Sequence, residues 1–279
     1  MVDFILEPLR YAFMMRGLLA AVIVGVVCAV MGTYIVLRGM AFFGDALAHS
    51  ILPGVAVGYL VGGGERQPVF WWGLITAVLA SLGIGTISKQ SKVKEDTAIG
   101  IIFAGMFALG IALISSVRTY TADLTHFLFG DVLGVATEDL ILTAVFGGIV
   151  LLVVAAFYKE FLVLAFDPIL AATLRLPARF FEYLLLILIA VTIVVALQTV
   201  GVALMVAMLV TPAATAYLLT HRMVVMMALA ACFAAAAGVM GLYLSYYASI
   251  ASGAAIVLVC TGFFLLVLLL TSQQRNAKS

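Results

Sequence analysis

The chain has 279 residues, of which 66% are hydrophobic and only 10% are charged, and its mean hydropathy is +1.29. A soluble domain is typically about half apolar and about a quarter charged. The apolar excess is more than one soluble core can hold, so lipid must solvate much of the surface. The net charge is only +1, and no basic stripe with interleaved aromatic side chains is present, so we expect no nucleic-acid partner.

Nine apolar runs are long enough to cross a bilayer, whose hydrocarbon core takes about 20 helical residues. Backbone groups in lipid must bond within their own segment, and the runs do not alternate polar and apolar residues as barrel strands do. The sequence therefore predicts an all-α polytopic membrane protein, with residues 1–16 as an interfacial segment, 17–271 as the membrane domain and 272–279 as a tail. The expected spans are 17–37, 41–62, 69–88, 97–117, 138–158, 181–198, 201–220, 223–247 and 252–271.

The number of spans is open at one place, because the chain is almost continuously apolar from Tyr183 to Thr220 and is interrupted only near Gln198–Gly201. Two helices in a tight hairpin would give nine spans, and one irregular helix would give eight. With nine spans, ten of the 14 Lys and Arg residues fall on one side, whereas eight spans split them seven to seven. Basic residues concentrate on the cytoplasmic side. This favours nine spans, with the N-terminus outside and the C-terminus in the cytoplasm.

A connection on the outer side, residues 118–137, is longer than a bundle requires. It contains Asp123, His126 and Asp131, and its apolar stretch Phe127–Val135 is too short to span. We interpret that stretch as re-entrant or interfacial. The three polar side chains could collect a cation or form an outer gate, although polar residues on an exposed loop are more often simply solvated.

A second long connection, residues 159–180, lies on the cytoplasmic side. It is amphipathic, and Pro168 and Pro177 mark boundaries within it. A segment of this kind can lie on the membrane surface or dock a partner.

The second span carries two ionisable side chains, Asp45 and His49, which are costly inside a membrane and by default indicate function. At a spacing of four residues they share one helical face. Counted from Arg38, Asp45 lies about 10 Å and His49 about 16 Å into the bilayer. Pro53 and Gly54 interrupt the helix just beyond, as discontinuous helices do at transporter sites.

An Asp oxygen and a His nitrogen one turn apart can bind a single divalent cation. This donor pair suits manganese, zinc or ferrous iron, and no thiolate is nearby to favour a softer metal. One chain supplies only two ligands, whereas a two-fold dimer with this face at its axis supplies four. The alternative is structural: an Asp–His hydrogen bond that locks two helices together.

Other chemistry finds no support in the sequence. The phosphate-binding pattern GxxxxGKS/T is missing, as are HExxH and GxSxG. If ATP drives transport, the ATPase must be a separate chain. The cysteines Cys28, Cys232 and Cys260 all stand in apolar runs, and we expect them to be buried and inert.

Five segments of the sequence carry a resemblance to a known family. They are GDALAHSILPGVAVG (44–58), EDTAIGI (95–101), HFLFGDVL (126–133), KEFLVLAFD (159–167) and VGVALMVAMLVTPAATAYLL (200–219). Together they resemble the manganese/zinc/iron permease family of ABC importers and occur in that family's order, and the match extends from about residue 10 to residue 270. The most specific of them is GDALAHSILPGVAVG.

The resemblance implies a fold similar to the vitamin B12 and siderophore importers and a location in the prokaryotic plasma membrane. It implies a homodimer that binds two cytoplasmic ATPase subunits and receives metal from an extracellular or periplasmic binding protein. The family's metal-site residues fall on Asp45 and His49. Many relatives have Glu and Gly where this chain has Ile169 and Arg175. The implied ATPase-docking residues are Phe166, Asp167, Pro168, Ala171 and Arg175.

The sequence therefore predicts a permease subunit that is not itself an enzyme and holds no permanent cofactor. Its cargo is a divalent transition metal, with manganese favoured over zinc or iron. The alternative is a self-sufficient secondary transporter or channel for such a metal.

Overall fold

The computed structural model describes residues 7–63, 65–90, 93–115, 132–166 and 176–276, and all regular secondary structure within them is helical. The elements are η1 (Pro8–Arg10), α2 (Ala12–Leu37), α3 (Phe43–Ser50), α4 (Leu52–Gly62), α5 (Arg66–Gln90), α6 (Glu95–Ser115), η2 (Val132–Gly134), α8 (Thr137–Ala156), α9 (Tyr158–Phe166), α11 (Ala178–Val200), α12 (Val202–Leu219), α13 (Met223–Ala248) and α14 (Ser252–Asn276).

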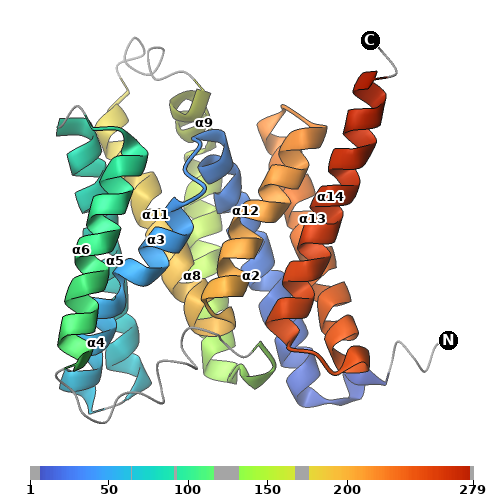
Figure 1. Ribbon diagram of the computed structural model, residues 1–279, viewed down its shortest axis with the longest axis horizontal. Helices are drawn as coiled ribbons and strands as arrows, with labels where there is room; N and C mark the ends of the chain where they lie inside the picture. The colour runs from blue at the N-terminus through green and yellow to red at the C-terminus, as the bar shows by residue number, and fades with distance from the viewer. Residues whose placement is uncertain (1–6, 64, 91–92, 116–131, 167–175, 277–279) are drawn as a thin grey trace.

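Within the described ranges, nine helical segments are long and apolar enough to cross a membrane, with α3 and α4 counted as one. This confirms the all-α prediction and the larger of the two span counts. The decisive connection is Gly201 between α11 and α12, with φ 80° and ψ 170°. A positive φ of this size favours glycine, and it lets two helices reverse direction across a single residue (Figure 1).

The expected span limits are close to the helix ends, with two differences at the termini. The first long helix begins at Ala12, earlier than residue 17, and the last continues to Asn276, beyond residue 271. Both extensions add residues beyond the apolar run. Backbone hydrogen bonding continues a helix past the edge of the apolar stretch, so hydropathy alone places helix ends inward of their true positions.

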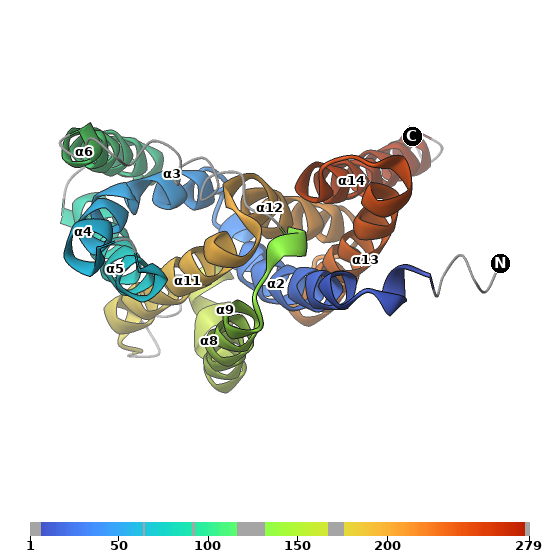
Figure 2. The ribbon, with the colours of Figure 1, turned by 90° about the horizontal axis from the view of Figure 1, so that it is seen from below.

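The bundle is built around α2 and α11, which are mostly buried, whereas α6, α8 and α14 are among the least buried helices. α2 packs against α8, α11, α12 and α13. Figure 2 shows α3 and α12 between α6 and α14 along one side of the bundle, with α8 and α9 on the opposite side.

Small residues let the central helices approach closely. A Cβ added at Gly32 of α2 would overlap the backbone carbonyl of Leu209 on α12. Gly241 of α13 lies against the backbone of Ile256 on α14 in the same way, since an added Cβ would be 2.5 Å from its Cα. Lipid is as apolar as the helix surfaces, so close backbone packing of this kind holds membrane helices together.

Candidate metal site

The candidate site lies where the second span is broken. α3 ends at Ser50, Ile51 intervenes, and α4 begins at Leu52, with Pro53 in its first turn. Proline has no backbone N–H and cannot continue the hydrogen bonds of α3. Figure 1 shows α3 crossing the front of the bundle near half its height and α4 continuing toward one end.

Neighbouring helices fix this break from two sides. Gly54 of α4 lies so close to α5 that an added Cβ would overlap the Trp72 carbonyl and the Thr76 hydroxyl. On the other side, a Cβ at Gly110 of α6 would be 2.6 Å from Cβ of Leu52. The position of α3 is therefore set by backbone packing at its C-terminal end.

The two candidate ligands occupy the open face of α3. The opposite face is fully buried and includes Phe43 and Leu47, and Gly44 lies against the Leu209 side chain of α12. The side chains of Asp45 and His49 keep 39% and 27% of their surface exposed. The predicted shared face is therefore present, and among the described residues it is only partly covered.

Asp45 Oδ1 and His49 Nε2 lie 3.7 Å apart. This is too long for a hydrogen bond, which has a donor–acceptor distance of about 2.7–3.2 Å. With metal–ligand distances of about 2.1 Å, two atoms that bind one ion stand about 3.0–3.4 Å apart at octahedral or tetrahedral angles. A shift of a few tenths of an ångström would bring the pair to that separation.

The remainder of the His49 ring contacts α6. Its centroid lies 6.0 Å from that of Phe103 and 5.7 Å from that of Phe107, with interplanar angles of 61° and 85°. Its second nitrogen, Nδ1, is buried and has no hydrogen-bond partner in the described part of the chain. Only Nε2, which faces Asp45, is available to a ligand. Across the described ranges, no three His, Cys, Asp or Glu residues gather as a metal site, so one chain offers only this pair there.

The predicted outer-gate residues Asp123, His126 and Asp131 lie outside the described residues, as do Ile169 and four of the docking residues: Asp167, Pro168, Ala171 and Arg175. The described end of the outer connection is η2, which packs against α2.

The fifth docking residue, Phe166, is the last residue of α9 and is 54% exposed. The opposite side of α9 is held by aromatic contacts. Phe161 is fully buried, with its ring centroid 5.8 Å from Tyr34 of α2 and 6.0 Å from Phe181 of α11. Phe157, just before α9, also contacts Phe181 at 5.4 Å. α9 is therefore packed firmly against the two central helices.

Charged residues gather at the same end of the bundle as α9. Lys89 of α5 pairs with Glu182 of α11 and lies 5.8 Å from the ring centroid of Tyr183. Burial lowers the pKa of Arg38, and the nearby carboxylate of Glu95 opposes that change. An arginine stays protonated in proteins, so this end of the bundle carries permanent positive charge.

A second polar cluster, at the opposite end, did not emerge from the sequence. Asp139 in the first turn of α8 accepts hydrogen bonds from Gln198 Nε2 of α11 at 3.2 Å and from the Ala136 backbone N–H at 3.3 Å. Arg66 Nη1 of α5 lies 3.6 Å from Oδ2, the same carboxylate oxygen that accepts from the Ala136 N–H. The cluster ties α5, α8 and α11 together.

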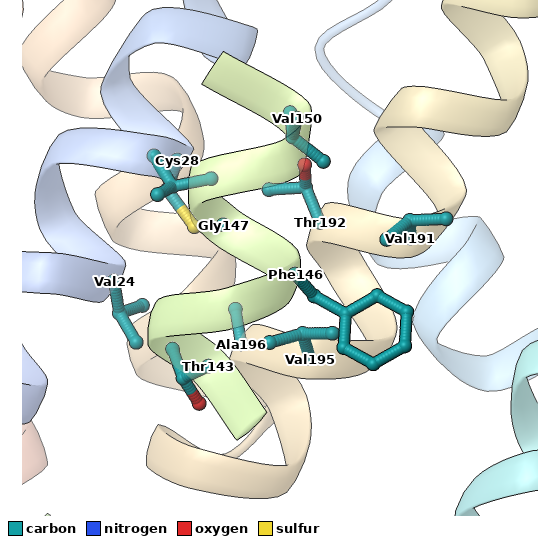
Figure 3. Close-up of a pocket in the computed structure, with 11 residues that line it drawn as sticks. Val24, Cys28, Thr143, Phe146, Gly147, Val150, Val191, Thr192, Val195 and Ala196 are labelled. Carbon is teal, nitrogen blue, oxygen red and sulfur yellow. The ribbon is translucent and has the colours of Figure 1, made fainter. Parts of the chain in front are cut away.

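A small pocket between α2, α8 and α11 has no metal-binding character (Figure 3). Its polar side chains are the thiol of Cys28 and the hydroxyls of Thr143 and Thr192, and both hydroxyls bond to carbonyls of their own helices. Its other lining residues are Val24, Val27, Phe146, Gly147, Val150, Val191, Val195 and Ala196.

The cysteines show why burial within a membrane bundle is difficult to predict. Cys28 and Cys260 are buried as expected, whereas Cys232 on α13 is exposed, so the prediction was wrong there. An apolar run does not reveal which of its faces meets lipid and which meets protein.

A family model described as the ABC 3 transport family matches residues 10–271. The chain belongs to the ABC 3 transport family. This membership confirms the resemblance found in the sequence motifs, and it covers all nine candidate spans apart from the final residues of the last one.

Two relatives show how closely the family is matched. The chain is 48% identical to the manganese transport system membrane protein MntC of Listeria monocytogenes serovar 1/2a over 257 residues, or 92% of this chain and 90% of that protein. It is 41% identical to a probable iron transport system membrane protein of Haemophilus influenzae, covering 95% and 96% of the two chains.

A solved structure, PsaBC from Streptococcus pneumoniae in complex with Fab, has a chain with the same fold. The TM-score is 0.82 at 39% identity, and the match covers 95% of this chain and 94% of that chain. The arrangement of helices around α3 is thus shared with a related protein.

The sequence missed Phe103 and Phe107 as neighbours of the candidate ligands. With Gly110 they repeat at a spacing of four and three residues along α6, which places all three on one helical face. That signal was available, but α6 is apolar on every side, so the repeat does not stand out.

Proposed function

We propose that this chain is the membrane-spanning permease subunit of an ABC importer for divalent transition-metal ions, with alternating access around Asp45 and His49. The observation that carries the proposal is this pair, on a partly exposed face of a broken helix near half the height of the bundle, with ligand atoms 3.7 Å apart. An ionisable pair at that depth is costly unless it serves a function.

The donor set supports the cargo class. A carboxylate oxygen and an imidazole nitrogen suit manganese, iron and zinc, and the buried thiol of Cys28 is on another helix and lines a separate pocket. Relatives described as manganese and iron transport proteins favour manganese first, then iron or zinc. The ion is carried as substrate, and no resident cofactor is required.

A homodimer would complete the site. A metal ion usually needs at least four ligands, and two copies of the chain supply two Asp45 and two His49 side chains. The face that carries them lies between α6 and α14 (Figure 2), both of which are little buried and expose large apolar side chains such as Leu109 and Leu258. A second copy over this face would enclose the ligands between the two chains.

ATP hydrolysis belongs to separate partners, because the chain contains no nucleotide-binding pattern. We place two cytoplasmic ATPase subunits at the end of the bundle that holds α9. The aromatic packing of Phe161 makes α9 a stiff support, and Phe166 is exposed beside the expected docking segment 159–180. A metal-binding protein would deliver cargo at the opposite end.

The proposal includes an orientation in the prokaryotic plasma membrane. The charged end with Arg38 and Lys89 faces the cytoplasm, in line with the usual distribution of basic residues. α2 begins at the opposite end, so the N-terminus is outside, and α14 ends at the cytoplasmic side (Figure 1).

The test is metal uptake by proteoliposomes that contain the complete transporter. Asp45→Asn and His49→Ala should each lower Mn²⁺ uptake per assembled complex by at least about tenfold, because each removes a metal ligand. Asp139→Asn is the matched control, since it makes the same change in the polar cluster at the far end and should leave uptake per assembled complex near normal.

Two results would count against the proposal. Near-normal uptake in both ligand variants would return Asp45 and His49 to a packing role. Uphill uptake by the permease alone, driven by a proton gradient without the ATPase, would favour a self-sufficient secondary transporter.

A further inference from the structure

We infer that Phe103 and Phe107 of α6 position the His49 imidazole for its metal cargo, so that ring packing replaces the hydrogen bond that usually orients a metal-binding histidine. The inference rests on the proposed function, and it adds two positioning residues and a reason for moderate affinity.

The first observation is the missing hydrogen bond. A histidine that binds metal through one ring nitrogen almost always donates the N–H of the other nitrogen to a carboxylate, a carbonyl or water, which fixes the ring orientation. In His49 the second nitrogen, Nδ1, is buried and has no hydrogen-bond partner among the residues that the structure describes. Within that part of the chain, contacts other than a hydrogen bond hold the ring with Nε2 toward Asp45.

The aromatic contacts provide that hold. Phe107 meets the imidazole at 85° with a centroid distance of 5.7 Å, and Phe103 at 61° with 6.0 Å. These distances and steep angles are those of favourable edge-to-face pairs. Phe103 and Phe107 also stack on each other at 5.7 Å and 28°, and Phe42 contacts Phe103 at 6.0 Å. The imidazole thus packs against a connected group of rings.

The rings are themselves held in register with the site. Phe103, Phe107 and Gly110 lie on the face of α6 that meets α3 and α4. Gly110 packs directly on the helix break, where an added Cβ would be 3.1 Å from the backbone nitrogen of Pro53. The same break ends the helix that carries His49, so packing of α6 on the break sets the position of its rings relative to the imidazole.

This arrangement has a consequence for affinity. A hydrogen bond from the second nitrogen to a carboxylate or carbonyl makes a histidine a more basic and tighter ligand. Ring packing orients the imidazole without that gain. The site therefore combines a fixed ligand geometry with a lower affinity for the metal ion, which suits an ion that must be released in each transport cycle.

The experiment measures Mn²⁺ binding to the purified complete transporter by electron paramagnetic resonance of the free ion, and uptake in proteoliposomes. Phe103→Leu and Phe107→Leu should each raise the dissociation constant and the half-saturating Mn²⁺ concentration about 2- to 10-fold, with little change in the maximal rate. Phe107→Tyr keeps the ring and should stay within about twofold of the parent.

Phe146→Leu is the control, because Phe146 forms similar tilted ring contacts with Phe70 and Trp71 on the far side of the bundle. Unchanged Mn²⁺ affinity in both leucine variants, or an equal loss in Phe146→Leu, would overturn the inference. His49→Ala is run in the same assay to test the proposed function separately. Full Mn²⁺ binding and uptake in His49→Ala would contradict the proposed metal site itself. If His49→Ala loses Mn²⁺ binding while both leucine variants keep it, only the positioning role of the two phenylalanines is contradicted.

Discussion

Two groups of polar side chains lie within this apolar bundle, and their surroundings differ in kind. At one end, the carboxylate of Asp139 accepts two hydrogen bonds and faces Arg66, and it is only 14% exposed. At mid-height, Asp45 and His49 face each other without a hydrogen bond, and both remain partly exposed. Within the described residues, the carboxylate of Asp139 has hydrogen-bond partners from its own chain, although Oε1 of its neighbour Gln198 has none, whereas Asp45 and His49 do not bond to each other.

The difference separates structural from functional polarity. A polar group in a membrane protein costs free energy unless it finds partners. Asp139 finds them on α5 and α11 and so links three helices. The pair on α3 directs Asp45 Oδ1 and His49 Nε2 toward each other on a partly exposed face, at a distance too long for a hydrogen bond. We interpret the Asp139 cluster as a structural link between helices. We interpret the Asp45–His49 pair as a binding site for an ion that a second copy of the chain completes.

Stability measurements should separate the two most strongly. Asp139→Ala leaves the Gln198 amide and the Ala136 N–H without their carboxylate, and it should lower the free energy of unfolding by about 2–3 kcal/mol. Asp45→Ala should change it by less than about 0.5 kcal/mol in metal-free buffer. In a dimer with four ligands at the axis, Asp45→Ala also removes the repulsion between the two Asp45 carboxylates, which favours the folded protein. The measurement is unfolding of the purified transporter in detergent with a metal chelator present.

The same unfolding measurement with and without metal separates the two carboxylates further. When Mn²⁺ replaces the chelator, the parent should gain stability from the bound ion, whereas Asp45→Ala should gain little. Asp139→Ala should gain as much as the parent. A loss of stability in Asp45→Ala equal to that in Asp139→Ala would show that both carboxylates are structural and would erase the distinction.

Much of the fold follows from the sequence because the membrane imposes a length on each helix. The apolar runs locate the nine spans, and the distribution of basic residues correctly favours a hairpin near Gly201. The i, i+4 spacing correctly puts Asp45 and His49 on one face. These are local or one-dimensional properties, which a sequence records directly.

The neighbours of the site could not be predicted in this way. In a soluble protein the buried face of a helix is apolar and the exposed face is polar, so composition reveals orientation. In lipid both faces are apolar. Nothing in the composition of α6 shows that Phe103 and Phe107 face His49, or that Cys232 faces outward. The partners of Asp139 come from helices distant in sequence, and only the packing brings them together.

A smaller effect tests whether the structural group extends deeper into the bundle. One turn further along α8 from Asp139, the hydroxyl of Thr143 lies 2.7 Å from that of Thr199 on α11, and both residues are buried. Thr143→Val keeps the shape and removes this bond between helices, so it should cost about 0.5–1 kcal/mol.

Thr192→Val is the matched control. Its hydroxyl is equally buried but bonds to the Leu188 carbonyl of its own helix at 2.8 Å, so among the described residues the change breaks no hydrogen bond between helices, and it should cost less. An equal loss in both variants would mean that the Thr143–Thr199 bond adds nothing to helix association. The same unfolding assay provides the answer.

The smallest effect concerns Arg66, the charged partner of Asp139. Its side chain is 82% exposed, and its Nη1 lies 3.6 Å from the carboxylate, so water and salt weaken the attraction. Exposed ion pairs contribute between zero and about 1 kcal/mol. Arg66→Ala should therefore cost no more than about 0.5 kcal/mol, and less in high salt, because Gln198 and the Ala136 N–H still satisfy Asp139. Unfolding of the variant at low and high ionic strength measures both quantities. If Arg66→Ala lowers the free energy of unfolding as much as Asp139→Ala does, the Asp139 carboxylate depends on the charge of Arg66. Asp139 and Asp45 would then differ only in how strongly each depends on a positive charge.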